Sequence, residues 1–111
     1  MKVLTKLEEN VLLVILRLED DAYIVSIKTT LEKYFKKNIS FGALYLSLNR
    51  LIRDKYLRTE IGEATSQKGG RAKKYYRITR EGVLKLKEIY SLQKKMWVDF
   101  ERLSGKILEK G

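Results

Sequence analysis

The chain has 111 residues, of which 44% are hydrophobic and 34% charged, and its formal net charge is +10 at pH 7. This length points to one compact domain, and the absence of cysteine and histidine excludes disulfides, thiol nucleophiles, zinc sites of the usual ligand types and imidazole catalysis. No apolar run approaches the ~18 residues that span a bilayer, so we expect a cytoplasmic protein that is not an enzyme and needs no cofactor.

Two amphipathic helices are predicted in the first third of the chain. Residues 5–18 carry apolar residues at helical spacing, and Thr5 followed by Glu8 forms a capping-box pattern at the start. After a polar break, residues 22–35 repeat the helical spacing, and Asn38 suits the turn that follows.

A third helix is predicted to begin at Ser40, which suits an N-cap position. One side of this helix is apolar, whereas the opposite side combines small and hydrogen-bonding residues, namely Ala43, Ser47, Arg50 and Asp54, with Leu46, Asn49 and Arg53 flanking them. Two helices joined by a short turn, the second with such a face, are typical of a helix-turn-helix that enters a major groove. We therefore expect direct groove contacts from Ser40, Ala43, Ser47 and Arg50.

A β-hairpin is predicted next. Residues 56–61 and 73–78 have strand-like patterns, and the segment between them contains Gly69-Gly70. The tip combines a flexible backbone with four cations, which we expect to contact DNA phosphates rather than to read bases. These four residues are Lys68, Arg71, Lys73 and Lys74. Tyr75 and Tyr76 alternate faces, so one of them is expected to pack on the body.

The last predicted helix begins after the N-cap residue Thr79 and runs close to the C-terminus. Its apolar stripe is too long for so small a body to cover, which makes a second copy of the chain the natural partner. The predicted dimer interface consists of Leu86, Tyr90, Gln93, Trp97, Phe100 and Ile107, with Gln93 as a polar interruption.

Together these elements predict a mainly α fold with a small β-hairpin: a winged helix-turn-helix followed by a long C-terminal dimerisation helix. We expect residues 1–79 to form the DNA-binding part and residues 80–111 the dimerisation helix, within one compact unit. Positive charge is concentrated where DNA contact is expected, because residues 38–79 hold nine basic and three acidic residues. A concentrated basic region favours phosphate binding, although a generally lysine-rich surface would also give a basic chain.

Two sequence segments, residues 42–51 (Gly-Ala-Leu-Tyr-Leu-Ser-Leu-Asn-Arg-Leu) and 69–82 (Gly-Gly-Arg-Ala-Lys-Lys-Tyr-Tyr-Arg-Ile-Thr-Arg-Glu-Gly), resemble the PadR family of bacterial and archaeal regulators. The resemblance covers roughly residues 5–90, and the pairing of a Leu-Tyr recognition helix with a Gly-Gly-Arg wing is more specific than either part alone. The short length is similar to that of members with a single C-terminal helix.

The resemblance implies roles for individual residues. Tyr45 corresponds to a recognition-helix tyrosine whose hydroxyl reaches a DNA phosphate, although its position on the apolar stripe also fits a core residue. In some members of the family an aromatic-lined pore at the dimer interface binds planar hydrophobic compounds. Trp97 and Phe100 suit such an effector site, although packing in the dimer core is the plainer interpretation.

The leading hypothesis is a homodimeric repressor that binds an inverted-repeat operator in double-stranded DNA through its helix near residues 40–55 and its wing near residues 66–74. The alternative is a winged-helix protein-interaction module without specific DNA binding. Binding at a membrane surface is disfavoured, because Glu88, Asp99 and Glu101 interrupt the cationic face that such a helix needs.

Overall fold

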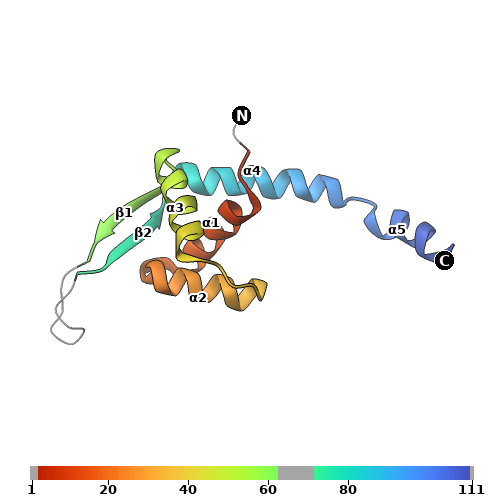
Figure 1. Cartoon of the computed structure of the whole chain (residues 1–111). Coiled ribbons are helices and arrows are strands. Elements are labelled where there is room, and N and C mark those ends of the chain that lie inside the picture. The colour runs from red at the N-terminus through yellow and green to blue at the C-terminus, as the bar shows by residue number, and fades with distance from the viewer. Residues whose placement is uncertain (1–2, 63–71, 111) are drawn as a thin grey trace.

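The computed structural model of the chain describes residues 3–62 and 72–110. In this part of the chain, five α-helices and one short 3₁₀ turn accompany a single two-stranded antiparallel sheet (Figure 1). The prediction of a mainly α fold with a small β-hairpin is confirmed. The elements are α1 (Lys6–Leu18), η1 (Glu19–Asp21), α2 (Ile24–Phe35), α3 (Phe41–Arg53), β1 (Leu57–Ile61), β2 (Lys74–Ile78), α4 (Arg80–Trp97) and α5 (Phe100–Glu109).

Side chains at three helix starts accept hydrogen bonds from backbone groups that the helix itself leaves unpaired. Thr5 and Glu8 form the predicted capping box, in which the Glu8 N–H donates to Thr5 Oγ1 (3.1 Å) and the Thr5 N–H donates to Glu8 Oε1 (2.8 Å). Ser40 Oγ caps α3 by accepting from the Ala43 N–H at 3.0 Å. Thr79 Oγ1 caps α4 by accepting from the Gly82 N–H, also at 3.0 Å.

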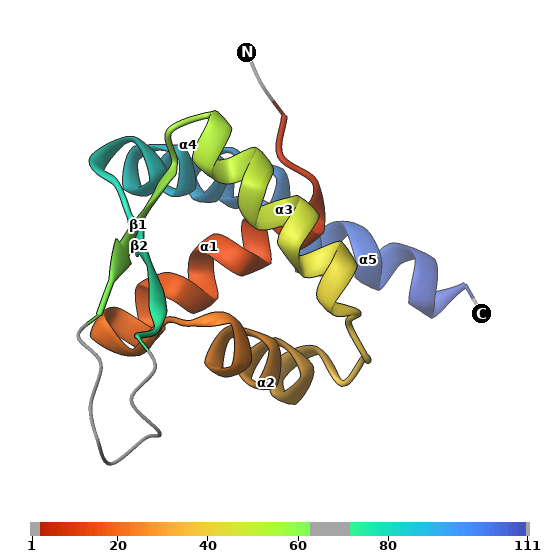
Figure 2. The same ribbon diagram turned by 60° about the vertical axis from the view of Figure 1, so that its left-hand side comes forward.

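The hydrophobic core lies where α1, α2 and α3 meet the inner side of β2 and the first turns of α4. Figure 2 shows α3 crossing in front of α1, with α2 below and α4 behind. Apolar side chains at helical spacing on each helix converge there, and their removal from water stabilises the fold. The buried members are Val11, Leu12, Val14, Ile15, Ala22, Ile27, Leu31, Leu44, Leu48, Leu51, Leu57, Tyr76 and Leu86.

The hairpin pairs Leu57 with Ile78 and Ile61 with Lys74, so its strands match the predicted ones to within one residue. Strand β2 is also attached to the body, because the Tyr76 N–H donates to the carbonyl of Ala22, just before α2, at 2.8 Å. The Tyr76 side chain is buried, which confirms that one of the two adjacent tyrosines packs on the body. The predicted tip cations Lys68 and Arg71 lie outside the described residues.

The prediction of one uninterrupted C-terminal helix is wrong. Helix α4 ends at Trp97, Val98 has an extended ψ of 135°, and Asp99 adopts a left-handed φ of 66° before α5 begins. Aspartate tolerates this conformation better than most residues, because its short polar side chain bonds locally. The break contains neither of the usual helix breakers, proline and glycine, whereas Gly105 lies inside α5.

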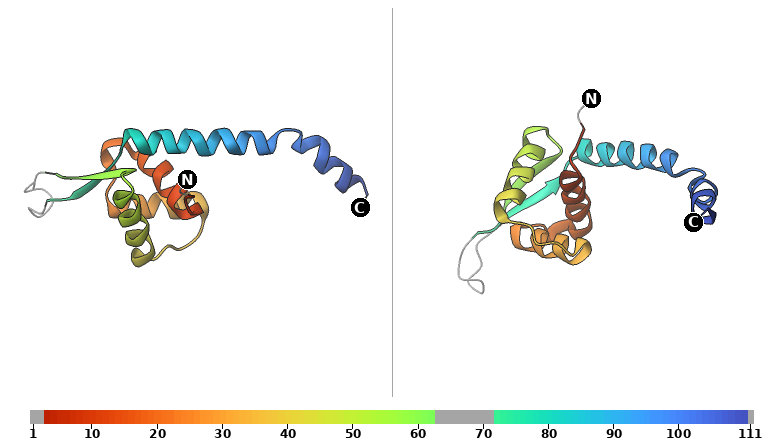
Figure 3. Two further views of the ribbon diagram at one scale, coloured as in Figure 1. Left: turned by 90° about the horizontal axis from the view of Figure 1, so that it is seen from above. Right: turned by 45° about the vertical axis from the view of Figure 1, so that its right-hand side comes forward.

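The C-terminal half of α4 and all of α5 project from the body (Figure 3). The radius of gyration is 17.7 Å, compared with about 13 Å for a compact domain of this length. The projecting segment therefore has little support from its own protomer.

Gly82 marks a close contact between the first turn of α4 and the end of the α3–β1 connection. A Cβ atom at this position would clash with the Tyr56 carbonyl oxygen and lie 2.7 Å from Ile78 Cγ1. Gly82→Ala is therefore expected to destabilise the fold by about 1–3 kcal/mol through overpacking, measured by denaturant unfolding. Gly42→Ala is the control, because a Cβ atom there meets nothing within 4 Å. Equal stability of the two variants would contradict the contact.

Candidate nucleic-acid interface

Helix α3 presents one face to the core and the other to solvent. Leu44, Ser47, Leu48 and Leu51 are buried, and at 3.6 residues per turn they occupy one side of the helix. The centre of the opposite side is a row of exposed residues, which we call the outer stripe: Gly42, Leu46, Asn49 and Arg53. Ala43 and Arg50 lie along one edge of this stripe and Tyr45 along the other, and all three are exposed.

The exposed face of α3 is rotated around the helix axis by about one residue position from the face that the sequence predicted. Ser47 is only 5% exposed, so its predicted contact with the groove is wrong. It lies three residues after Leu44 and four before Leu51, which places it on the buried side. The sequence reasoning treated Leu46, Asn49 and Arg53 as flanking residues and omitted Gly42. A helical projection centred on Leu44, Leu48 and Leu51 would have placed all four members of the outer stripe on the exposed side.

A network of contacts fixes the connection between α2 and α3. The carboxylate of Glu32 accepts hydrogen bonds from Lys28 Nζ (2.8 Å) and from the Ile39 N–H (2.9 Å). The hydrogen bond from Lys28, and to a smaller extent the one from Ile39, holds the pKa of Glu32 below its ordinary value. Lys28 Nζ also lies 5.2 Å from the centre of the Phe41 ring, at the start of α3. The entry to α3 is thus tied to α2 by one acidic side chain.

A hollow of about 290 Å³ lies between α3 and the outer part of strand β2. Its lining comes from the N-terminal end of α2, from α3 and from β2, namely Tyr23, Ile24, Val25, Tyr45, Lys73, Lys74 and Tyr76. Tyr45 is 44% exposed, so its phenol is accessible from solvent and it is not a core residue. Burial raises the pKa of the Tyr76 phenol above its ordinary value, and the neighbouring Tyr45 raises it further.

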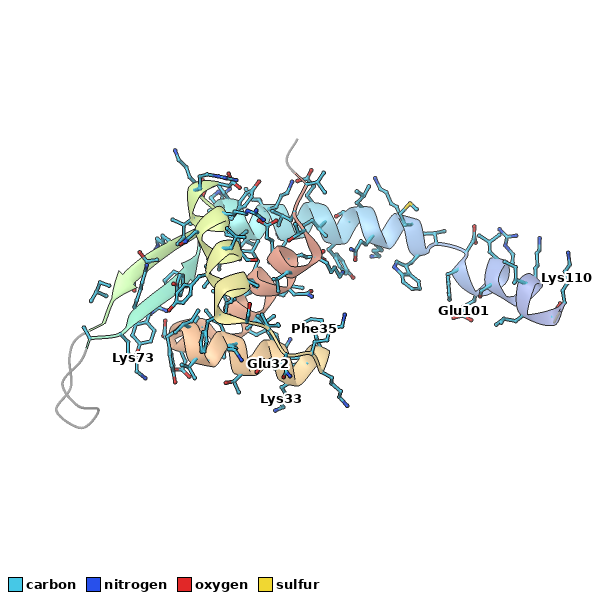
Figure 4. All side chains as sticks on the ribbon, in the orientation of Figure 1. Glu32, Lys33, Phe35, Lys73, Glu101 and Lys110 are labelled. Carbon is cyan, nitrogen blue, oxygen red and sulfur yellow. The ribbon has the colours of Figure 1, made fainter. Side chains whose placement is uncertain are left out.

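Aromatic and cationic side chains lie together at the outer end of strand β2, beside the start of α2. The Tyr23 and Tyr75 rings meet edge to face with centroids 6.0 Å apart, and Lys73 Nζ lies 3.9 Å from the centre of the Tyr23 ring. Figure 4 places Lys73 at the outer end of β2, far from Glu101 on α5 and from Lys110, which follows α5. Lys73 is half-buried and Lys74 is exposed, so the outer end of the hairpin strands carries two of the four predicted wing cations.

Five of the six predicted dimer residues are exposed in the single chain, namely Tyr90, Gln93, Trp97, Phe100 and Ile107. The prediction for Leu86 is wrong, because its side chain is buried against its own protomer and belongs to the core. The Trp97 and Phe100 rings contact each other across the α4–α5 break, with centroids 4.7 Å apart. They line an open hollow of about 450 Å³ together with Asp99, Glu101 and Arg102.

Within the part of the chain that the structure describes, no helix has the length and apolar character needed to cross a membrane.

Three helices around a core, the third presenting an exposed face beside a two-stranded hairpin, define a winged helix-turn-helix. The chain belongs to the PadR-like family of transcriptional regulators, which it matches over residues 11–88. It is accordingly a transcriptional regulator with the winged-helix DNA-binding fold, as the sequence resemblance indicated.

Solved structures give the same result. A PadR-like transcription factor from Bacteroides fragilis is 29% identical, with a TM-score of 0.71 over 87% of this chain and 88% of that chain. A PadR-like transcriptional regulator from Bacillus cereus is 26% identical, with a TM-score of 0.67 over 92% and 90%. RosR of H. salinarum, at 22% identity, shares the fold, with a TM-score of 0.70 over 98% and 94%. No curated protein matches the chain significantly.

Proposed function

We propose that the protein is a homodimeric repressor that binds an inverted-repeat operator in double-stranded DNA. In this proposal α3 of each protomer enters a major groove, and the two grooves lie about one helical turn apart. The single observation that carries the proposal is the outer stripe of α3, which is exposed although its helix is otherwise packed into the core. Tyr45 borders the stripe and shares a hollow with Lys73 and Lys74 at the outer end of the hairpin strands.

The phosphate contacts are proposed from chemistry and position. Lys73 and Lys74, at the outer end of the hairpin strands, share a hollow with Tyr45 of α3. Lys68 and Arg71 lie outside the described residues, and we propose phosphate contacts for them from their charge. The accessible Tyr45 phenol is a hydrogen-bond donor at the same hollow. Such contacts position a protein on DNA and make its affinity strongly dependent on salt.

The proposed dimer rests on the projecting helices. Trp97, Ile107 and their apolar neighbours are exposed on a segment that its own protomer does not support. A partner chain would remove this surface from water, which favours association. A further hollow of about 240 Å³ lies between α4 and the N-terminal segment. It is lined by Val3, Leu4, Ile89 and Leu92 together with the polar residues Glu9, Lys85, Glu88 and Gln93.

Substitutions of single cations test the separate contributions of α3 and the wing to DNA binding. Arg50→Ala, at the edge of the outer stripe, is expected to weaken operator binding by about 5- to 150-fold and to reduce selectivity over a scrambled duplex. Lys73→Ala is expected to weaken binding to both duplexes alike and to lower the slope of log affinity against log salt by about 1. Both effects are measured by fluorescence anisotropy at several salt concentrations.

Lys87→Ala is the matched control, because it removes one exposed cation from α4. It is expected to leave the operator affinity, the selectivity and the slope of log affinity against log salt unchanged. If Arg50→Ala and Lys73→Ala both behaved like this control, α3 and the wing would not form the DNA-binding surface, and the protein-interaction alternative would gain support.

A further inference from the structure

We infer that α3 reads A·T base pairs through Leu46 and Asn49, with Gly42 as its point of closest approach to the DNA. The inference rests on the proposed function, because it specifies which base pairs the same surface recognises. Three features of the outer stripe carry it: an exposed leucine, an exposed asparagine beside it, and a glycine for which the protomer offers no reason.

Leu46 is 52% exposed at the centre of the outer stripe. Its side chain has no donor or acceptor and makes only apolar contacts. In the major groove the apolar group on a base edge is the C5 methyl of thymine. A leucine at the centre of a groove-facing surface therefore favours thymine at the base pair that it meets.

Asn49 lies three residues further along α3, on the same face. Its amide offers a donor and an acceptor together, which match N7 and the N6 amino group of adenine. Three helical residues rise about 4.5 Å, whereas successive base pairs are about 3.4 Å apart. Leu46 and Asn49 therefore address the same or neighbouring base pairs, and both chemistries select A·T.

Gly42 stands one turn before Leu46, in the first turn of α3. A Cβ atom there would meet nothing within 4 Å, and Gly42 does not adopt a positive φ, so neither packing nor backbone conformation in the described chain requires glycine. Glycine weakens a helix relative to alanine by up to about 1 kcal/mol. Close approach of another molecule explains a glycine of this kind, and on this face the other molecule is the DNA.

Two arginines also lie on or beside the outer stripe. The Arg53 guanidinium lies 3.3 Å from the Asp54 carboxylate, and Arg50 stands at the edge of the stripe. Arg53 stands at the C-terminal end of the stripe and Arg50 at its edge, so the side chains in the middle of the stripe are Leu46 and Asn49. This arrangement favours an A·T step at the centre of each half-site.

The test begins with selection of preferred sites from a random pool of duplexes by the full-length protein. Thymines of the selected site are then replaced one at a time by deoxyuridine, which lacks the C5 methyl group. At one position in each half-site the wild type is expected to lose about fourfold in affinity, the scale of burying one methyl-sized group. Leu46→Ala should lose affinity for the natural site and become indifferent to deoxyuridine at that position.

Leu16→Ala, which truncates an exposed leucine of α1, is the matched control and should retain the full deoxyuridine effect. Asn49→Ala should lose discrimination between A·T and G·C at the neighbouring pair. If the wild type bound its selected site specifically but tolerated deoxyuridine at every position, the inference would be overturned and the proposed function would stand. If no site were enriched, both would fail.

Gly42→Ala provides an independent measurement of the close approach. The variant is expected to have equal or higher thermal stability, because alanine suits the helix better. Its affinity for the selected site is expected to fall by about tenfold or more, the scale of one lost base contact. Unchanged affinity would overturn the close approach at Gly42.

Discussion

Trp97→Glu is expected to convert the proposed dimer into a monomer and to weaken binding to the proposed operator by about 100-fold or more. The Trp97 side chain is 62% exposed in the single chain, so a charge there leaves the protomer's own core intact. In a dimer the same charge would be buried against apolar groups without a partner, which is strongly unfavourable. Loss of the dimer removes the gain in affinity from binding two half-sites at once, which is commonly 10²- to 10⁴-fold.

The oligomeric state of the Trp97 variant is measured by sedimentation equilibrium, and its DNA affinity by fluorescence anisotropy. Leu16→Glu is the control, because it places the same charge on an exposed leucine of α1. A Trp97→Glu protein that remained dimeric and bound the operator like the wild type would show that the projecting helices do not hold the dimer together.

Leu48→Ala is expected to lower the free energy of unfolding by about 2–5 kcal/mol, because it leaves a cavity in a well-packed core. The Leu48 side chain is completely buried between α3 and the remaining core. Domains of this size have about 5–15 kcal/mol of stability in total, so the loss is a large part of it.

Leu46→Ala is the matched control on the same helix, since Leu46 is largely exposed. Surface substitutions of this kind change stability by about 0.5 kcal/mol or less. Both variants are unfolded with urea at one fixed protomer concentration, because the stability of a dimer depends on concentration. Equal losses for the two leucines would contradict the assignment of the buried and exposed faces of α3.

Much of the fold is predictable because local rules and core packing agree. Thr5, Ser40 and Thr79 are good N-cap residues, and each caps a helix in the structure. The alternation of Tyr75 and Tyr76 likewise places one side chain in the core and the other against Tyr23. At these positions the local preference and the tertiary structure favour the same arrangement.

The α4–α5 break was not predictable from breaker residues. An aspartate with a left-handed backbone at position 99 ends the helical path although proline is absent from the chain. A breaker rule finds proline and glycine, so it missed the break and let the predicted helix run close to the C-terminus. The apolar periodicity continues across the break, which explains why the stripe suggested one helix.

The candidate site was predictable in outline only. Periodicity identified α3 and its exposed side, but an error of one position moved Ser47 to the wrong face and left Gly42 out. Helical positions are 100° apart, so a face defined by four residues shifts substantially when one core residue is misassigned. Leu86 was assigned to the dimer because periodicity does not tell whether a buried stripe faces its own protomer or another.

The central claim is that this winged helix recognises a specific DNA site as a dimer. The most direct test is a fluorescence-anisotropy titration of the wild-type protein with its selected duplex and with a scrambled duplex of the same composition, at two salt concentrations. The account predicts a dissociation constant of about 10⁻⁸ M or tighter for the selected duplex, two chains per duplex, far weaker binding to the scrambled one, and loss of affinity with salt. Equally weak binding to both duplexes would contradict it.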